Sequence, residues 1–391
     1  MKKKIIFLLV CIPYIIKCQD PSFSQFDLNM MNSNPAFTSY EGGTKILLHS
    51  RNQWNRINEN FNNSLFEISS RSTLNRNSRK MKVAWAYGLS FLSEDLMVFP
   101  EIGNSVFIKK KELLLFPFTL EMKITKNSYI SASPLNVTFR KYDLETGDLI
   151  FSDMIDDFGN IYSIENSGFN PDIYIHNNWI SDLSFGFIYT RHGQYQNSKT
   201  NRFNIGISSH HILNPIESFS GNDVLDSRIP SKFTIHTEIY SAIPSYKRPF
   251  IPYFRILFKH ENYIKDYTSI MKKTEFGSTI FLNNTNLEIG SLFRINQNLE
   301  NKINLHNWIP IMRYRIRNGD HLLILSYSYD ANITLSSNNL QFLNTGTTHE
   351  IGLSIYLNSG NGRNKSCAAF EDMRNNPLYQ DIMNNGLLNK R

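Results

Sequence analysis

Between about Gly43 and Asn358, short stretches of alternating apolar and polar residues follow one another, separated by clusters of Asn, Gly, Asp, Ser and Pro. Successive side chains of a strand point to opposite faces, so each stretch predicts a β-strand with one apolar and one polar face. The last stretch is the clearest, with Ile351, Leu353, Ile355 and Leu357 on one face and Gly352, Ser354, Tyr356 and Asn358 on the other.

Two more stretches keep charged and aliphatic side chains apart in the same way. They place Leu287, Ile289, Ser291 and Phe293 opposite Glu288, Gly290, Leu292 and Arg294, and Phe233, Ile235, Thr237 and Ile239 opposite Thr234, His236, Glu238 and Tyr240. Further strands centre on residues 44–50, 64–73, 83–92, 104–110, 113–125, 183–191, 202–211, 250–259, 274–282 and 321–330.

With the less regular stretches, this pattern predicts roughly 14 strands, within a range of about 12–16, each near the 9–11 residues of a tilted membrane strand. We therefore expect an all-β chain: a transmembrane antiparallel β-barrel over residues 43–358. A soluble β-sandwich shows a similar alternation and is the structural alternative. No fixed-period repeat and no linker rich in Pro and Ser occurs, so the barrel is expected to be one domain.

The two ends of the chain lie outside the alternating pattern. Lys2, Lys3 and Lys4 precede an apolar core over residues 5–16, which predicts a signal peptide over residues 1–18. Cleavage is expected after Cys18, with acylation of Cys18 as the alternative. Residues 19–42 are predicted to be an N-terminal periplasmic segment that acts as a plug or lead-in, and residues 359–391 a periplasmic tail, since an even strand number puts both ends in the periplasm.

Composition supports an exported barrel. Aromatic residues make up 13% of the chain, a share that suits strands and membrane interfaces. Beyond the N-terminus no apolar run reaches the roughly 18 residues of a spanning helix. Cys367 is the only cysteine after the predicted leader, so it has no partner for an intramolecular disulfide. The formal charge of +7 includes Lys2, Lys3 and Lys4 of the leader and is otherwise scattered, which predicts contact with acidic lipid headgroups or an acidic partner and no nucleic acid.

Motifs of catalysis are incomplete. A zinc-protease helix carries its second histidine four positions after the first. After His349-Glu350 that position holds Leu353, and after His260-Glu261 it holds Ile264. Asn364 replaces the glycine that a phosphate loop needs before Lys365-Ser366, and the pair Asp156-Asp157 resembles solvated turn residues more than a calcium site. We therefore predict no catalytic residue, no metal site and no cofactor.

His210 and His211 follow Ser208 and Ser209, a grouping that suggests the nucleophile and base of an outer-membrane phospholipase. Neighbouring residues of a strand point to opposite faces, so the two histidines are not expected to share one pocket without a bulge. A structural or partner-contact role is the favoured interpretation.

Short sequence words are more specific. An ordered set opens the mature chain, and later segments continue it: QDPSFSQF from residue 19, Asn34-Pro35-Ala36-Phe37, Arg51-Asn52-Gln53-Trp54, GISSHHILNPIESF over 206–219, IPSKFTIH over 229–236, residues 290–294, SYSYD over 326–330 and residues 346–356. In this order the words resemble the PorP/SprF family of type IX secretion system membrane proteins, over almost the whole chain. One departure is Cys367-Ala368, where the family often has a Cys-Pro pair.

The resemblance implies an outer-membrane barrel of the type IX machinery, which exports proteins and, in gliding bacteria, places adhesins on the cell surface. It also implies partners among periplasmic secretion and motility components and a particular secreted or surface-displayed cargo. The candidate contact or structural residues are Asn34, Pro35, Arg51, Asn52, Gln53, Trp54, His210, His211, Pro215, Tyr329 and Asp330.

Physical chemistry suggests roles for some of these residues. Asn34-Pro35 favours a turn that bends the N-terminal segment into the barrel mouth. Arg51 and Trp54 suit a protein interface, but a lumen charge and a membrane-surface girdle residue fit them equally well. His210 and Pro215 resemble a strand end that leads into a loop.

Three functions remain open at this point. The first is a noncatalytic export-machinery barrel that binds, exports or anchors a surface protein. The second is a porin or a channel for hydrophobic solutes, and the third is an outer-membrane lipid hydrolase.

Overall fold

A computed structural model of the chain describes the strands, part of the segment before them and some connections. The described residues are 23–38, 40, 43–53, 59–73, 83–98, 106–115, 117–125, 127–145, 179–195, 198–216, 228–242, 253–265, 268–282, 286–297, 303–318, 321–332 and 348–357. The predicted leader, Trp54, Asp156-Asp157 and the predicted tail with Cys367 lie outside these ranges.

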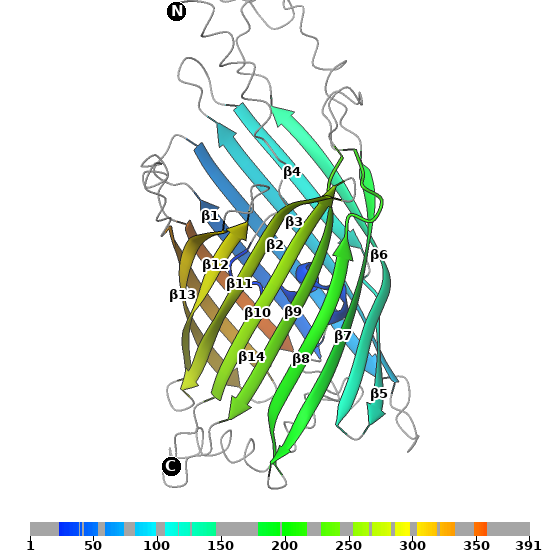
Figure 1. Cartoon of the computed structure of the whole chain (residues 1–391), viewed down its shortest axis with the longest axis vertical. Helices are drawn as coiled ribbons and strands as arrows, with labels where there is room; N and C mark the ends of the chain where they lie inside the picture. Colours follow the sequence, from blue (N-terminus) through cyan, green and yellow to red (C-terminus); the bar gives the residue numbers. More distant parts are fainter. Residues whose placement is uncertain are drawn as a thin grey trace, which may run out of the picture.

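The described strands form one antiparallel sheet that closes on itself (Figure 1). Each strand pairs with the next along the chain, except that β4 and β5 both pair with β3 and β6 and not with each other. β1 also pairs with the last strand, so the described sheet has no free edge. The strands are β1 (Thr44–Gln53), β2 (Glu59–Thr73), β3 (Val83–Val98), β4 (Val106–Leu115), β5 (Thr119–Thr125), β6 (Ser128–Glu145), β7 (Ile180–Tyr195), β8 (Ser198–His210), β9 (Ser231–Ala242), β10 (Tyr253–Lys265), β11 (Thr268–Leu282), β12 (Leu287–Gln297), β13 (Ile303–Asn318), β14 (His321–Asn332) and β15 (Thr348–Leu357).

Fifteen strand segments fill fourteen wall positions, because β4 and β5 share one position. β3 pairs with β4 over residues 89–98 and with β5 over residues 83–86, and β6 pairs with both in the same way. Pro117 lies in the interruption, where a residue without an N–H cannot complete the hydrogen-bond ladder. The structure thus confirms the predicted barrel of roughly 14 strands.

Two details of the strand prediction differ. Residues 104–110 and 113–125 were expected to be separate strands, whereas their counterparts β4 and β5 follow each other along one wall position. β6 and β13 correspond to none of the clear stretches. Pro134 and the neighbouring Leu135 interrupt the pairing of β6 with β7, which obscures the alternation of β6 in the sequence.

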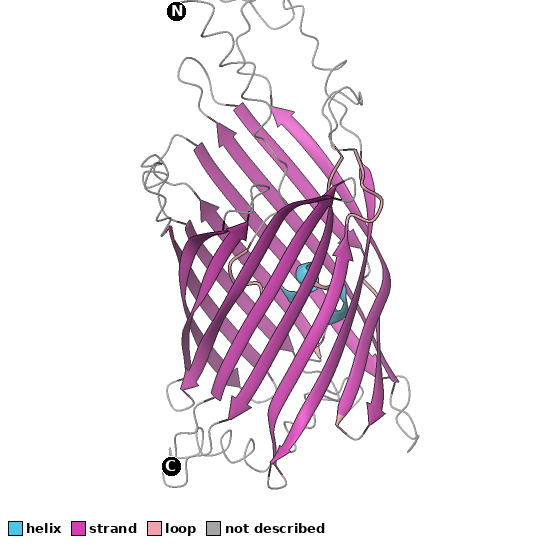
Figure 2. Cartoon of the chain, viewed as in Figure 1, coloured by secondary structure: helices cyan, strands magenta, loops and turns pink. Residues whose placement is uncertain are grey.

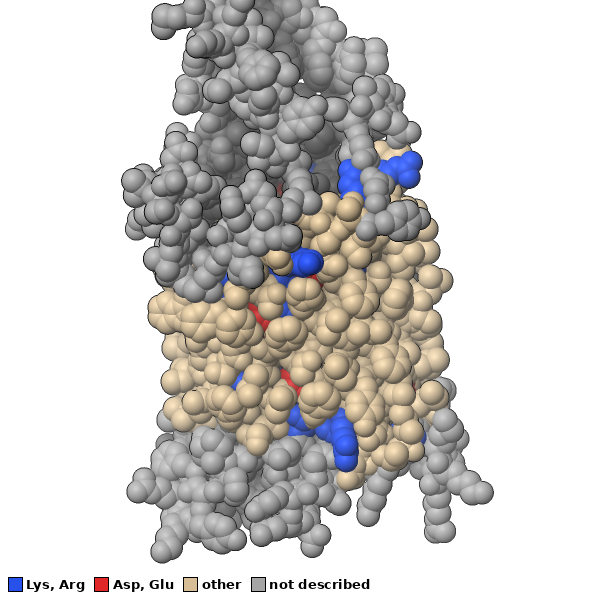
Figure 3. Space-filling view, viewed as in Figure 1, with Lys and Arg blue, Asp and Glu red and all other residues tan. Residues whose placement is uncertain are grey.

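The alternation along each strand separates an apolar exterior from a polar lumen. On β15, Glu350, Gly352 and Ser354 are buried, while the side chain of Ile351 is 62% exposed. Charged side chains are few in the middle band of the face shown in Figure 3. Apolar outside and polar inside is the arrangement of a barrel that faces lipid, and it is the reverse of a soluble protein.

The connections differ in length at the two ends of the barrel. Successive wall positions run in opposite directions, so the connections alternate between the two ends of the barrel. One end has the connections over residues 74–82, 126–127, 196–197, 243–252, 283–286 and 319–320. The other end has those over residues 54–58, 99–105, 146–179, 211–230, 266–267, 298–302 and 333–347. The second end carries the longer connections. Among the described residues, no helix is long and apolar enough to cross a membrane.

Candidate functional site

The lumen is occupied by the segment that precedes β1. We call residues Phe23–Thr38 together with Tyr40 the plug. They include the single-turn helix α2 (Met30–Ser33) and the 3-10 turn η2 (Pro35–Phe37), which appear inside the barrel in Figure 2. All plug residues are buried except Asn32 and Ser33, which are half-buried.

Local chemistry explains the bend between α2 and η2. Asn34 is extended, with φ −153° and ψ 113°, as the residue before a proline prefers to be. Its side-chain Oδ1 accepts a hydrogen bond from the backbone N–H of Ala36 at 2.9 Å and so caps η2. Pro35 occupies the first position of η2, where its missing N–H costs nothing.

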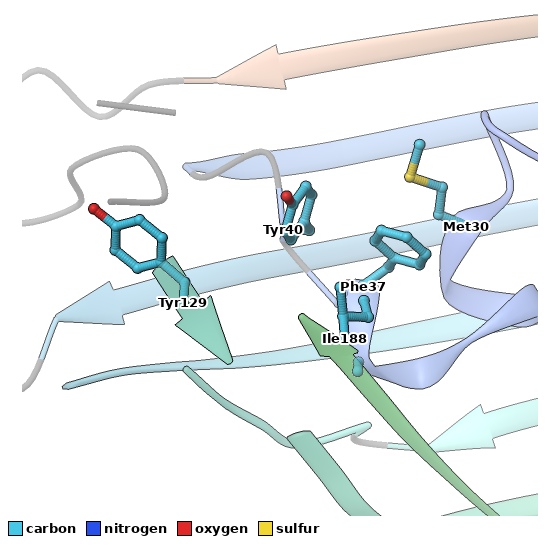
Figure 4. Close-up of a cluster of buried hydrophobic side chains, with 6 residues drawn as sticks. Met30, Phe37, Tyr40, Tyr129 and Ile188 are labelled. Atoms are coloured by element: carbon cyan, nitrogen blue, oxygen red, sulfur yellow. The ribbon is translucent and has the colours of Figure 1, made fainter. Parts of the chain in front are cut away.

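Three apolar clusters attach the plug to the wall. Each one joins plug side chains to inward-facing apolar side chains of the strands, which interrupt an otherwise polar lumen. The clusters are Phe23 and Leu28 with Leu47, Leu65 and Leu92; Phe26 with Leu257, Leu292, Ile309 and Ile311; and Met30, Ala36, Phe37 and Tyr40 with Tyr129 and Ile188, most of which are labelled in Figure 4.

Ser24 connects the plug to the join between β1 and β15. Its backbone N–H donates to Oε1 of Glu350 at 2.6 Å, and its hydroxyl donates to Oδ2 of Asp330 at 2.6 Å. Arg51 donates to the Ser24 hydroxyl at 2.7 Å and also forms ion pairs with Glu350 and Asp330. Arg294 completes the group with contacts to Ser24 and Asp330 at 2.9 and 3.1 Å. Buried ionised groups require such partners, and here each carboxylate has at least one.

Asp27 forms ion pairs with two arginines of the wall. Arg313 donates to both carboxylate oxygens, at 2.6 and 2.7 Å, and Arg255 forms a second ion pair with Oδ2. Burial opposes ionisation of Asp27, but the charges of Arg313 and Arg255 outweigh it and hold its pKa below the usual value. Asp27 is therefore a carboxylate at neutral pH.

Asn34 occupies a socket between two glycines of the wall. Its Nδ2 donates to the carbonyl oxygens of Phe187 at 3.2 Å and Ile207 at 3.1 Å, and lies 2.8 Å from Nε2 of His236. A Cβ on Gly186 would overlap Oδ1 of Asn34, and a Cβ on Gly206 would overlap the ring of His236. The side-chain amide of Asn34 thus fills space that side chains at positions 186 and 206 of the wall would otherwise need.

Further contacts run from the plug to β1, β5, β7 and β8. The hydroxyl of Tyr40 bonds to Thr190 at 2.9 Å and to Asn204 at 2.8 Å. Thr119 donates to the carbonyl of Pro35 at 3.0 Å, and Lys45 to that of Leu28 at 2.8 Å. The plug is therefore hydrogen-bonded to four further places on the wall.

The predicted residues divide into two groups. Asn34, Pro35, Arg51 and Asp330 lie at the boundary between plug and wall, and Gln53 accepts a hydrogen bond from Arg51 at 3.1 Å. Asn52, which bonds to Asn62, and Tyr329, which stacks edge-on with His349, lie on the outward face of their strands. Pro215 follows β8 and accepts from the N–H of Ile229.

The two histidines depart from the sequence expectation. His210 lies at the end of β8 and contacts the carbonyl of Ser33 at 3.2 Å, so its ring faces the lumen. His211 has left the strand, with φ 58°, and its ring also turns inward, where Nδ1 lies 2.5 Å from Oδ2 of Asp182. The prediction that they point to opposite faces was wrong because alternation ends with the strand.

The geometry around the histidines does not form a hydrolase triad. Nε2 of His211 faces Arg140 at 3.4 Å, and the hydroxyl of Ser208 donates to the carbonyl of Ser33 at 2.7 Å. Within the described ranges, no three His, Cys, Asp or Glu side chains gather as metal ligands would.

Sequence reasoning missed several residues that hold the plug: Asp27, Glu350, Arg313, Gly186 and Gly206. One signal was available, because Leu47, Leu257 and Leu292 interrupt the polar face of their strands. An apolar residue on a lumen-facing position indicates that something apolar fills the lumen.

The sequence of the chain matches one known protein family. The family described as type IX secretion system membrane protein PorP/SprF matches residues 15–355. No match was found among curated proteins.

Solved structures show low similarity. The chain resembles the beta domain of the Bordetella autotransporter BrkA at 12% identity and a TM-score of 0.40, covering 81% of this chain and 100% of that one. It resembles the Ralstonia pickettii toluene transporter TbuX at 13% identity and a TM-score of 0.40, covering 83% and 91%. A Pseudomonas aeruginosa FadL homologue matches at 10% identity and a TM-score of 0.39, covering 83% and 92%.

Proposed function

Because the chain belongs to the PorP/SprF family of type IX secretion system membrane proteins, we propose that it is a noncatalytic outer-membrane barrel that binds, exports or anchors one particular surface protein. Membership of the family already makes it a membrane component of this secretion machinery. The proposal adds that its work is protein recognition, carried out by loops and end segments while the barrel serves as a rigid support.

The observation that carries this proposal is the plug. Its side chains fill the middle of the lumen and are bonded to the wall through Ser24, Asp27 and Asn34. An open porin needs a continuous aqueous path, whereas this lumen is occupied by ion pairs and three apolar clusters. A filled barrel is better suited to holding a partner than to conducting solutes.

The unequal ends of the barrel suggest its orientation. In outer-membrane barrels the short turns face the periplasm and the long loops face outward. On this rule residues 146–179, 211–230 and 333–347 are extracellular, and the chain end after β15 is periplasmic. The periplasmic end then meets other secretion components, and the outer loops meet the displayed cargo.

Export by a cleaved leader over residues 1–18, with acylation of Cys18 as the alternative, is part of the same proposal. So are contacts of the apolar exterior with outer-membrane lipid and the division into a lead-in (19–42), a barrel (43–358) and a tail (359–391).

The two other functions have less support. A hydrophobic-solute channel would require the plug to leave or shift. A lipid hydrolase would require a nucleophile beside His211, where Asp182 and Arg140 lie instead.

Deletion of the gene tests the proposal. We expect one surface protein, or a small set, to be lost from the cell surface while other outer-membrane barrels assemble normally. Surface labelling and mass spectrometry of intact cells identify the lost protein, and pull-down from detergent-solubilised membranes should recover it with the barrel. An unchanged surface proteome in the deletion strain would contradict the proposal.

A further inference from the structure

The plug begins at the end of the barrel that carries the 333–347 connection, which we call the long-connection end. Ser24 bonds there to Glu350, just after this connection on β15, and to Asp330, just before it on β14. Arg51, which donates to the Ser24 hydroxyl, lies near the end of β1. The first residues of the plug are therefore attached to strand ends on the side of the long connections.

The chain leaves the plug at the opposite end of the barrel. The carbonyl oxygen of Gly43 accepts from the backbone N–H of Arg71 at 3.2 Å, near the end of β2 that leads to the 74–82 connection. Thr44, the first residue of β1, pairs with Leu357, the last residue of β15. The plug thus runs through the lumen in the direction opposite to β1, and the chain ahead of the plug starts at the end where β1 finishes.

Phe23 shows which part of the wall the chain meets before the plug begins. Its ring stacks on that of His49 with centroids 4.5 Å apart, and it packs with Leu65 on β2. The next inward-facing residue of β2 toward the long-connection end is Asn63. The chain ahead of Phe23 therefore starts beside Asn63.

Asn63 lacks the hydrogen bonds that a buried amide needs. Its residue is 0% exposed, and neither Oδ1 nor Nδ2 has a hydrogen-bond partner in the described part of the chain. A buried polar group without a partner is unfavourable. A peptide group offers the matching N–H and carbonyl oxygen, so a backbone that passes Asn63 would satisfy both atoms.

We propose that the chain ahead of Phe23 passes Asn63 and leaves the lumen at the long-connection end, which puts the amino terminus of the processed protein on the same side as the 146–179 connection. In the orientation proposed above, this side is the cell surface. An external partner would then meet the amino-terminal segment together with the long connections. Only the identity of the side rests on the proposed orientation.

Strand parity is compatible with this path. An even number of wall positions places the start of β1 and the end of β15 at one end of the barrel, as the pairing of Thr44 with Leu357 shows. Parity therefore fixes where the plug joins β1, but not where the plug begins. The expectation that all of residues 19–42 lie in the periplasm would then apply only to the last of them.

Thiol labelling of intact cells tests the side. Cys367 is the only cysteine after the predicted leader, so Cys367→Ser provides a background in which Asp20→Cys or Asp156→Cys is the single thiol. We expect a membrane-impermeant maleimide to label both of these variants on intact cells. Cys367 of the native chain follows β15 and should react only after the outer membrane is permeabilised.

The controls separate this proposal from the orientation of the barrel. If Asp156→Cys reacts on intact cells and Asp20→Cys does not, the proposal is overturned. If both require permeabilisation and Cys367 reacts without it, the barrel orientation is reversed, but the amino terminus still lies beside the long connections. Ser22→Cys is a second reporter if Asp20→Cys is not exported.

Disulfide formation tests the path past Asn63. In the Cys367→Ser background, Ser22→Cys combined with Asn63→Cys should oxidise to an intramolecular disulfide, which needs Cα atoms about 4.4–6.8 Å apart. The matched control combines Ser22→Cys with Ser69→Cys, because Ser69 is buried on the same face of β2 but nearer the short-connection end. This control pair should stay reduced.

Mass spectrometry after alkylation of the unfolded chain counts the free thiols. Heat-modified electrophoretic mobility verifies that each variant is a folded barrel. Equal oxidation of both pairs, or oxidation of neither, would overturn the path past Asn63.

Discussion

At the scale of single residues, the lumen is held together by charges whose partners lie on distant elements. Asp27 on the plug meets Arg313 on β13 and Arg255 on β10, and Arg51 on β1 meets Asp330 on β14 and Glu350 on β15. The Asp27 pairs fix the plug against the wall, whereas the Arg51 pairs link β1 to β14 and β15 at the closure of the barrel, where Arg51 and Glu350 are direct cross-strand partners.

Replacement of Asp27 by Asn should loosen the plug. The substitution removes two ion pairs, but Glu288 remains beside Arg313 and Glu238 beside Arg255. We therefore expect a loss of about 1–3 kcal/mol in the free energy of unfolding, below the cost of leaving a buried charge wholly unpaired. Denaturant titration in detergent measures it, and Asp95→Asn at an exposed position is the control, with a change below about 0.5 kcal/mol.

The same contact gives a pH dependence. Since the pKa of Asp27 is lowered from its usual value of 3.8, its contribution is fully present at neutral pH. It is lost as the pH falls through the lowered value, and Asp27→Asn should lack this acid-dependent step. An equal loss of stability in Asp27→Asn and Asp95→Asn would contradict the assignment.

The sequence identified part of this site. Asn34, Pro35, Arg51 and Asp330 were selected because they belong to short words shared with a family, and they do lie where the plug meets the wall. Asp27 and Glu350 belong to the same network but were missed, since a charge in a sequence does not reveal a partner 286 or 299 positions away. His211 was misjudged because the strand ended one residue before it.

At the scale of elements, the strands were predictable because lipid outside and a polar lumen inside impose alternation on each strand. The failures occur where another constraint acts. Pro117 divides one wall position into β4 and β5, and Pro134 interrupts β6. The plug has no periodic pattern at all, because its residues follow the shape of the lumen and not a regular hydrogen-bond ladder.

Gly186 on β7 is predicted to determine how the plug is seated. Gly186→Ala puts a methyl group where Oδ1 of Asn34 lies, so Asn34 must leave its socket and lose its bonds to Phe187, Ile207 and His236. We expect a destabilisation of about 1–3 kcal/mol. Limited proteolysis should cut the plug faster while the strands remain protected.

A double-mutant cycle checks this explanation. In the background of Asn34→Ala, which removes Oδ1, Gly186→Ala should cost less than it does in the native chain. Additive costs would show that the glycine serves another purpose.

At the scale of the whole molecule, the closed wall and the plug together make a filled barrel. Deletion of residues 23–40 should convert it into a pore, because the remaining lumen is lined by charged side chains. In planar bilayers we expect little conductance from the native chain and stable, salt-dependent conductance from the deletion variant. Asp27→Asn should open the pore only intermittently.

If the native chain conducts as strongly as the deletion variant, the filled-barrel interpretation is wrong and the porin function is favoured. Circular dichroism and heat-modified electrophoretic mobility establish that the deletion variant still forms a β-barrel. If it does not, the conductance of Gly186→Ala, in which the plug is loosened but present, is measured in its place.

From the contact between Ser24, Arg51 and Glu350 we also infer an order of folding. Arg51 and Glu350 are 299 positions apart, and they meet only when the first and last strands pair. Pairing across so long a stretch of chain is intrinsically slow, so it comes late in folding. By then the leading segment must already be within the curling sheet, since Ser24 bonds to both strands of this join. The strands are therefore expected to close around the plug. Pairing of β15 with β1 then completes the barrel and encloses the plug in one step.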